Sequence, residues 1–192
     1  MFGDPVENPM GWEIKKLESI ADIVSGITKG RKTKETELIE VPYMAVSNVK
    51  SGYIDWTTVK KIEATKAEIE MYRLKENDVL MAEGGDPDKV GRGALITCVP
   101  DNCIHQNHVF RVRLFRMNPI YFSQYLQHSK SKQYFLSCAK QTTGIASINM
   151  TQLKNLPVNF PPLPLQNTFA DFVQQIDKSK FEIEKFVKLV YN

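Results

Sequence analysis

A proline-rich stretch followed by a heptad pattern is the feature that most constrains this chain. Residues 156–164 contain four prolines, and an amphipathic segment begins at Leu165. Within that segment, the positions that recur at alternating spacings of three and four are apolar except at Ser179: Phe169, Phe172, Ile176, Ile183, Phe186 and Val190. This spacing predicts a helix with a coiled-coil seam.

The expected length of this helix indicates a role outside the globular body. At 1.5 Å per residue, a helix of about 26 residues is about 39 Å long. A body of about 165 residues cannot cover it fully, so we expect it to pair with another helix. The alternative is an amphipathic helix that folds back on its own domain.

Length and composition predict one globular domain with an appendage. The chain has 192 residues and a net charge of +3, which permits nucleic-acid binding without requiring it. Its cysteines, Cys98, Cys103 and Cys138, lack CxxC spacing, as is typical of free thiols in a reducing compartment. No apolar run approaches the ~20 residues of a membrane span, and residues 1–12 do not resemble a signal peptide. We expect a cytoplasmic protein.

The pattern of short apolar runs predicts an α+β body with a mixed sheet, followed by the long helix. The body is expected to occupy residues 1–160, and the helical unit residues 161–192. Strands are predicted at 41–46, 53–56, 78–82, 94–99 and 108–115, and helices near 17–24, 64–74 and 119–138. Residues 84–93 and 141–147 are expected to be loops.

Polar and basic residues gather in several of the predicted loops. The glycine-flanked loop at residues 26–34 carries four bases that could contact DNA phosphates, namely Lys29, Arg31, Lys32 and Lys34. Arg pairs with guanine, and Asn or Gln with adenine, so some of Asn48, Arg92, Gln141 and Thr143 are expected to touch bases. Lys50 and Lys89 are expected to touch the backbone, and Thr142 is a further DNA-binding candidate. Each loop taken alone could simply be solvated, and Arg92 could instead hold loop carbonyls.

Motifs for catalysis and cofactor binding are missing from the pattern. The glycine-rich segment 84–93 lacks the GK[ST] sequence of a phosphate-binding loop. His105 and His108 have no third ligand at metal-site spacing. We therefore expect no metal and no cofactor, and no enzymatic activity of the chain itself. Two alternatives stay open: a stand-alone nuclease or methyltransferase, and a coiled-coil adaptor that does not bind DNA.

The C-terminal part of the body resembles the end of a target-recognition domain in type I restriction–modification specificity subunits. Residues 144–167 read GIASINMTQLKNLPVNFPPLPLQN, and the family has a Leu-x-x-hydrophobic-Pro strand and a Pro-Pro-Leu-x-x-Gln turn there, before its spacer helix. Weaker resemblances run in family order through nearly the whole chain: residues 1–12, Trp12 with Lys16, Leu17 and Ile20, Leu74 with residues 78–80 and 90–92, and residues 103–107.

The resemblance implies a non-catalytic module that recognises double-stranded DNA. Specificity subunits of this family carry two recognition domains and two antiparallel helices, and each domain reads one half of a split target. The helices set the half-site spacing and dock the modification (methyltransferase) subunits, which engage the restriction subunit. This chain has one domain and one helix, so we expect a homodimer or pairing with a second half-subunit. The heptads still run at Asn192, so we expect the helix to be truncated.

Overall fold

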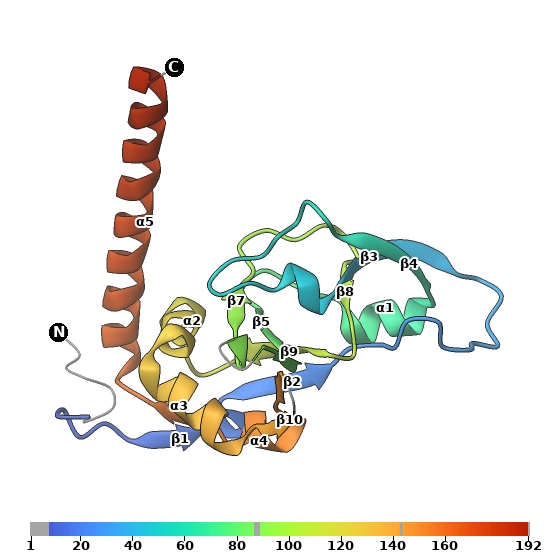
Figure 1. Cartoon of the computed structure of the whole chain (residues 1–192), viewed down its shortest axis with the longest axis horizontal. Helices are drawn as coiled ribbons and strands as arrows, with labels where there is room; N and C mark the ends of the chain where they lie inside the picture. The colour runs from blue at the N-terminus through green and yellow to red at the C-terminus, as the bar shows by residue number, and fades with distance from the viewer. Residues whose placement is uncertain (1–7, 87–88, 143, 192) are drawn as a thin grey trace.

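The computed structural model describes residues 8–86, 89–142 and 144–191, with the backbone alone at 141, 142, 190 and 191. Figure 1 shows a body of short strands and helices from which one long helix, α5 (Leu163–Tyr191), projects. The α+β class, the mixed sheets and the C-terminal helix agree with the prediction.

An antiparallel four-stranded sheet forms the centre of the body, in the order β2 (Ala21–Ser25), β9 (Val109–Leu114), β5 (Val79–Ala82) and β7 (Gly93–Leu95). Strand alternation places Phe110 and Val112 on one face, with Leu114 packed beside them, as predicted. These residues join the main core together with α2 (Pro119–Gln127), which packs against β7.

A second sheet lies at the end of the body away from α5, as Figure 1 shows. Its order is β4 (Lys60–Ala64), β3 (Ile39–Met44) and β8 (Ile104–His105); β3 is antiparallel to β4 and parallel to β8. Helix α1 (Lys66–Tyr72) covers it, and Ile69 belongs to the small core beneath. Thr65 and Glu68 form a capping box that fixes the start of α1.

Two smaller pairings complete the body. Strand β1 (Ile14–Lys16) pairs with β12 (Pro157–Asn159), so both ends of the body lie side by side. Strand β11 (Ile145–Ser147) pairs with β10 (Lys140–Thr142) and with β6 (Gly84–Gly85). Helix α3 (Ser129–Cys138) leads into β10, and helix α4 (Met150–Lys154) connects β11 to β12.

The first turn and a half of α5 is anchored on α2 by polar contacts and by ring packing. The buried Gln166 side chain accepts a hydrogen bond from Asn118 N at 2.9 Å and donates one to Pro161 O at 2.7 Å. Phe169 lies edge-on to Tyr121, with ring centroids 5.8 Å apart. The helix therefore leaves the body in a defined direction.

Several predicted elements differ from the structure because long-range pairing overrides local spacing. The expected helix at residues 17–24 is a 3-10 turn, η1 (Leu17–Ser19), followed by β2, which pairs with the distant β9. The strand expected at residues 53–56 is absent from that described segment; β4 forms at Lys60–Ala64 instead, where the repeated charges masked the alternation.

Two further boundaries also differ from the prediction. The helix expected over residues 119–138 breaks at His128, whose backbone is extended and whose ring Nδ1 accepts a hydrogen bond from Lys130 N at 3.2 Å, which caps α3. The loop expected at 141–147 is a β-hairpin, formed by β10 and β11, whose turn contains Gly144 at φ +78°.

Candidate nucleic-acid interface

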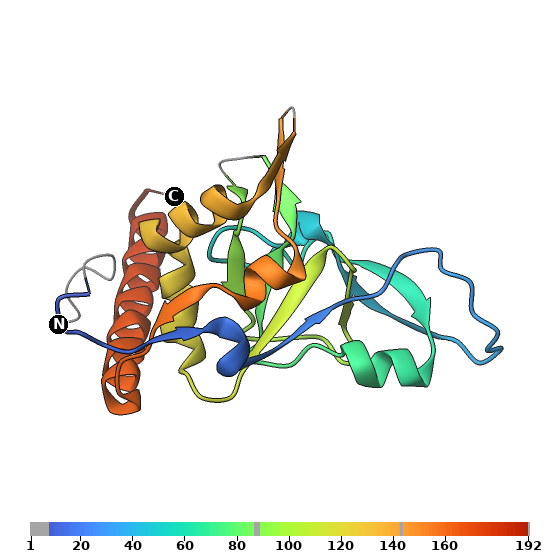
Figure 2. The same cartoon turned by 90° about the horizontal axis from the view of Figure 1, so that it is seen from below.

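Contacts in the structure connect four of the polar segments identified in the sequence, and we call the surface that they form the recognition face. Lys29 and Ser47 line the same cavity. Arg92 donates a hydrogen bond to Val46 O at 3.3 Å, which connects the 46–50 segment to the 84–92 segment. Residues 84 and 85 pair in turn with residues 146 and 147 of the β10–β11 hairpin. Segments far apart in sequence thus meet, and Figure 2 shows the hairpin (orange) standing out from the body.

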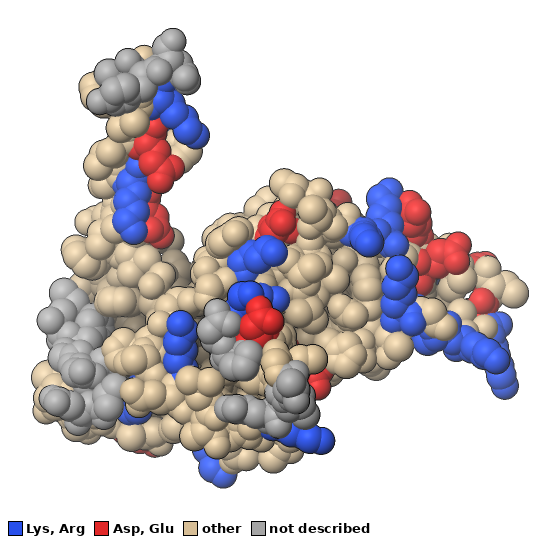
Figure 3. Space-filling view, in the orientation of Figure 1, with Lys and Arg blue, Asp and Glu red and all other residues tan. Residues whose placement is uncertain are grey.

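The basic loop between β2 and β3 contributes three of its four bases to the surface. Lys29, Lys32 and Lys34 are exposed. Figure 3 shows Lys and Arg side chains at this end of the molecule, with Asp and Glu side chains among them. The electrostatic character of this end is therefore mixed, and binding would depend on which cations are unpaired.

Arg31 differs from its neighbours because it is bound within the fold. Its guanidinium forms an ion pair with Glu68 at the start of α1 and donates to Glu63 O at 3.3 Å. The pairing lowers the pKa of Glu68 to about 2, chiefly through the hydrogen bonds from Arg31. This contact holds the loop on α1, and the phosphate contact expected of Arg31 stays a prediction.

Asn48 also has a structural place within the fold. Its side chain is 1% exposed. Its Oδ1 accepts a hydrogen bond from Ala45 N at 3.0 Å, and its Nδ2 donates to Asp55 O and Thr58 Oγ1, both at 3.0 Å. Because the amide is buried and engaged on both sides, it shapes the loop, and a base contact by Asn48 stays a prediction.

The remaining predicted residues that the structure describes belong to the segments of the recognition face. Lys50 is half-buried, and Lys89 forms an ion pair with Asp86. Arg92 is half-buried and holds a loop carbonyl, which was the alternative considered for it. Gln141 and Thr142 lie on β10, and Thr143 falls outside the described residues. Base or backbone contacts by these residues stay predictions.

Gly91 explains how Arg92 is positioned beside the core. The residue has φ +71°, and a Cβ atom there would lie 2.1 Å from Cδ2 of Phe135. Only glycine permits this approach, because any side chain would collide with the aromatic ring. The tight turn thus holds the 89–92 segment against α3, at the border between the core and the recognition face.

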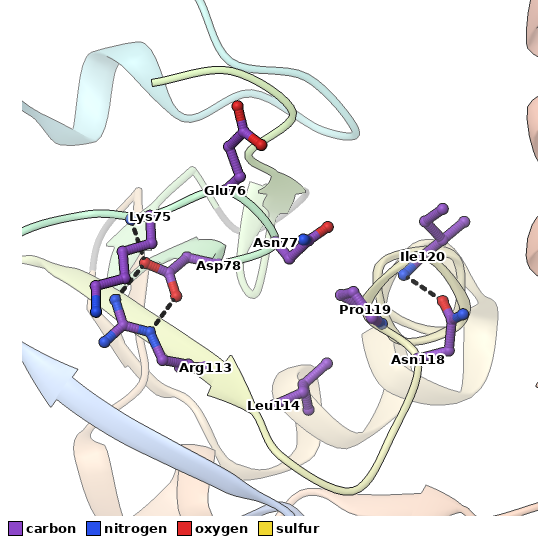
Figure 4. Close-up of a pocket in the computed structure, with 9 residues that line it drawn as sticks. All are labelled: Lys75, Glu76, Asn77, Asp78, Arg113, Leu114, Asn118, Pro119 and Ile120. Carbon is purple, nitrogen blue, oxygen red and sulfur yellow. Dashed lines mark hydrogen bonds and ion pairs between the residues drawn. The ribbon is translucent and has the colours of Figure 1, made fainter. Parts of the chain in front are cut away.

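A separate hollow between β5, β9 and the start of α2 is structural in character. It measures about 420 Å³ and contains Asp78 and Arg113. Arg113 donates to both carboxylate oxygens of Asp78 at 2.7 and 2.8 Å, and Lys75 N donates to the same carboxylate at 2.7 Å. Figure 4 shows the Asp78 and Arg113 side chains hydrogen-bonded to each other, with the Glu76 side chain pointing away from them. Three donors within the fold therefore engage the Asp78 carboxylate, which assigns this pair a structural role.

The two histidines weighed as metal ligands lie in different environments. His105 is buried, its Nδ1 lies 2.8 Å from Val109 O, and desolvation lowers its pKa to about 4. His108 is exposed and pairs with Glu83. Across residues 8–86, 89–142 and 144–191, no three His, Cys, Asp or Glu side chains come together as a metal site would require. Nor is any helix of those residues long and apolar enough to cross a membrane.

Comparison with known proteins shows which family this chain matches. The model of the type I restriction modification DNA specificity domain matches residues 9–189. The putative type I restriction enzyme MjaX specificity subunit of Methanocaldococcus jannaschii is 27% identical over 187 residues, which are 96% of this chain and 44% of that protein. The type I restriction enzyme EcoKI specificity subunit of Escherichia coli K12 is 25% identical over 177 residues, 90% of this chain and 38% of that protein.

Solved structures agree at the level of the fold. The HsdS subunit from Thermoanaerobacter tengcongensis aligns with a TM-score of 0.59 at 16% identity, over 92% of this chain and 40% of that one. The type I restriction–modification S subunit from M. genitalium aligns with a TM-score of 0.60 at 16% identity, over 95% of this chain and 43% of that one.

The fold and the matched length define a target-recognition domain with a long C-terminal helix. The chain belongs to the type I restriction modification DNA specificity family, as the resemblance in its sequence predicted. This membership places it with the non-catalytic specificity subunits and not with the modification or restriction enzymes. The chain spans about two fifths of the length of the curated relatives described above.

Proposed function

We propose that this chain recognises one half of a split DNA target through its recognition face. The observation that carries the proposal is the meeting of four polar segments on one side of a DNA specificity domain. Exposed Lys29, Lys32 and Lys34 would contact phosphates, while the β10–β11 hairpin and the 89–92 segment would approach base edges.

Selection of bound sequences from random duplexes tests this proposal. The full chain, alone and mixed with its modification subunit, should enrich one short motif and bind it more tightly than random DNA. Affinity for both should fall with salt, because phosphate contacts release counterions. Recovery of unenriched sequences under both conditions would contradict the proposal.

The exposed seam of α5 supports a further proposal, that of pairing between helices. Phe172, Ile183 and Phe186 are 55%, 62% and 66% exposed, and Ile176 is 38% exposed. At 3.6 residues per turn, the seam lies roughly a third of a turn from the buried Gln166 and Ala170, which face the body. A long apolar stripe on a single helix is typical of an interface.

An antiparallel homodimer through this seam would restore a two-domain arrangement and would imply a palindromic target. Two copies at about two fifths of a relative's length each would approach the length of a whole subunit. Light scattering at tens of micromolar should show a dimer, and Ile176→Asp with Ile183→Asp should give monomers. Pairing with a second half-subunit instead would leave the isolated chain monomeric.

Docking of partner subunits completes the proposed role in the cytoplasm. The paired helices would bind the modification subunits, which would engage the restriction subunit in turn. Co-purification of a tagged modification subunit with the chain tests this, and the same double substitution should reduce recovery if the seam organises the docking surface.

A further inference from the structure

A cavity on the recognition face has the chemistry of an anion site, and two of its important residues, Lys60 and Gln106, were not among the DNA-binding candidates. It measures about 170 Å³ and lies beside β3, β4 and the 45–48 segment. Tyr43 and Lys60 are opposite each other in the β3–β4 register, so both side chains lie on the cavity face of this strand pair. Lys29, in the loop that follows β2, lines the same cavity.

Two cations of the cavity are unpaired. Lys29 and Lys60 are exposed, and neither forms a salt bridge with any residue in the described part of the chain. Among the described residues that line the cavity, none is acidic. Their charges are therefore available to an anion from outside.

Neutral donors are left over in the same cavity. Gln106 accepts a hydrogen bond from Val46 N at 3.3 Å through its Oε1, so its amide nitrogen is left to donate elsewhere. The side chain of Ser47 is exposed and its hydroxyl can rotate toward a ligand. By contrast, the Tyr43 hydroxyl already donates to Ile27 O at 2.8 Å. The available groups are mainly donors, which suits an anion.

We infer that this cavity seats a single phosphate of the DNA backbone, held jointly by Lys29 and Lys60, with Gln106 and Ser47 as neutral donors. Lysine binds phosphate as a point charge, which suits a site that offers ammonium groups and neutral donors. A volume several times the ~30 Å³ share of a liquid water molecule admits a phosphate with part of its hydration. The inference rests on the proposed function, because it names the part of DNA that this site takes.

A DNA phosphate bound in this cavity would fix the position of the domain along the duplex. Phosphate contacts fix orientation without reading sequence. The buried Asn48 amide shapes the cavity wall, and Arg92 is tied to the same segment through Val46 O. Holding one phosphate here would therefore orient the 89–92 segment and the adjoining hairpin toward neighbouring base pairs.

The test combines Lys29→Gln with Lys60→Gln in the full chain and uses Lys61→Gln as the matched control. Lys61 follows Lys60 on β4 but lines a different hollow and pairs with Glu40 at 2.9 Å. Each phosphate of the selected duplex is replaced in turn by a neutral methylphosphonate. With the unaltered chain, neutralising the seated phosphate should weaken binding about tenfold, as loss of a charge-assisted hydrogen bond implies.

The double variant should lose its response at that one linkage and keep the responses elsewhere. Its log–log salt slope should become shallower by about 0.9, the value for one phosphate, whereas two separate contacts would give about 1.8. Lys61→Gln should retain the full pattern. Thermal unfolding of each variant checks that the surface changes leave the fold intact.

Two failures are distinguishable. If the unaltered chain binds its selected duplex but the double variant keeps every sensitive linkage, the phosphate seat is wrong and DNA recognition stands. A slope change near 1.8 with two linkages losing their response would also overturn the shared seat. If the unaltered chain binds no duplex, alone or with its modification subunit, both the proposed function and the seat fail.

Discussion

The central sheet and the recognition face differ in how their charged side chains are paired. In the sheet, Asp78 is 1% exposed and its carboxylate is held by Arg113 and by Lys75 N. On the recognition face, Lys29 and Lys60 have no acidic partner within the described residues. A buried charge is tolerated only when it is paired. An exposed cation is hydrated by water, so it needs no partner within the protein and stays available to a ligand. Pairing thus separates residues that hold the fold from residues that can bind.

The largest expected effect comes from breaking the scaffold at Asp78. Asp78→Ala leaves the Arg113 guanidinium and Lys75 N without their shared partner, so we expect a loss of about 3 kcal/mol in the free energy of unfolding. Urea denaturation measures it. Glu76→Ala, two residues away and exposed, should change stability by less than about 0.5 kcal/mol. Equal effects for the two variants would contradict the structural role of the pair.

A smaller effect is expected at Gly91, on the border between the two regions. Gly91→Ala meets both a left-handed backbone and the Phe135 ring, so we expect a cost of about 2–3 kcal/mol. Gly30→Ala is the matched control: Gly30 has φ +74°, but a Cβ there meets nothing within 4 Å. It should cost only the backbone strain, about 1 kcal/mol. Urea midpoints that do not differ would show that the Phe135 contact relaxes freely.

The prediction from sequence succeeded where the signal was local. Helix α1 follows a capping box, α2 begins at Asn118-Pro119, and α5 carries a heptad repeat, so each contains its own start or spacing signal. Local spacing at residues 17–24 predicts a helix, but β2 forms there because it pairs with β9, more than eighty residues away. Pairing with a distant strand cannot be recognised from the few residues of one strand alone.

The candidate site shows the same division. The loops at Lys29 and Ser47 were found from their composition, but nothing local to Arg31 reveals its pairing with Glu68, 37 residues away. The burial of Asn48 depends on the return of the chain through Asp55 and Thr58. Local sequence does not reveal the place of Lys60, because it predicts a strand at residues 53–56 and not at β4. Composition indicated which segments could bind, and the fold decided which side chains are available.

The Arg31–Glu68 pair gives a pH-dependent test of its scaffold role. Glu68 has its pKa lowered to about 2 in the folded chain, against an ordinary value of 4.5, so its stabilisation is present above about pH 4.5 and is lost as the pH falls toward 2. Arg31→Gln should cost about 1–2 kcal/mol at pH 7. The difference from the unaltered chain, measured by urea denaturation, should shrink below pH 4.5. A difference that stays constant to pH 3 would contradict the pairing.

The smallest effect on stability should come from the neighbours of Arg31, and it sharpens the comparison within a single loop. Lys32 and Lys34 are exposed and form no salt bridge with a described residue. Lys32→Gln with Lys34→Gln should change the free energy of unfolding by less than about 0.5 kcal/mol. The same variant should make the log–log salt slope of DNA binding shallower by up to about two units, because each lysine can neutralise one phosphate. Arg31→Gln should leave that slope unchanged while it destabilises the fold. If the slope instead responded to Arg31 and not to Lys32 and Lys34, pairing within the fold would not decide which residues bind DNA.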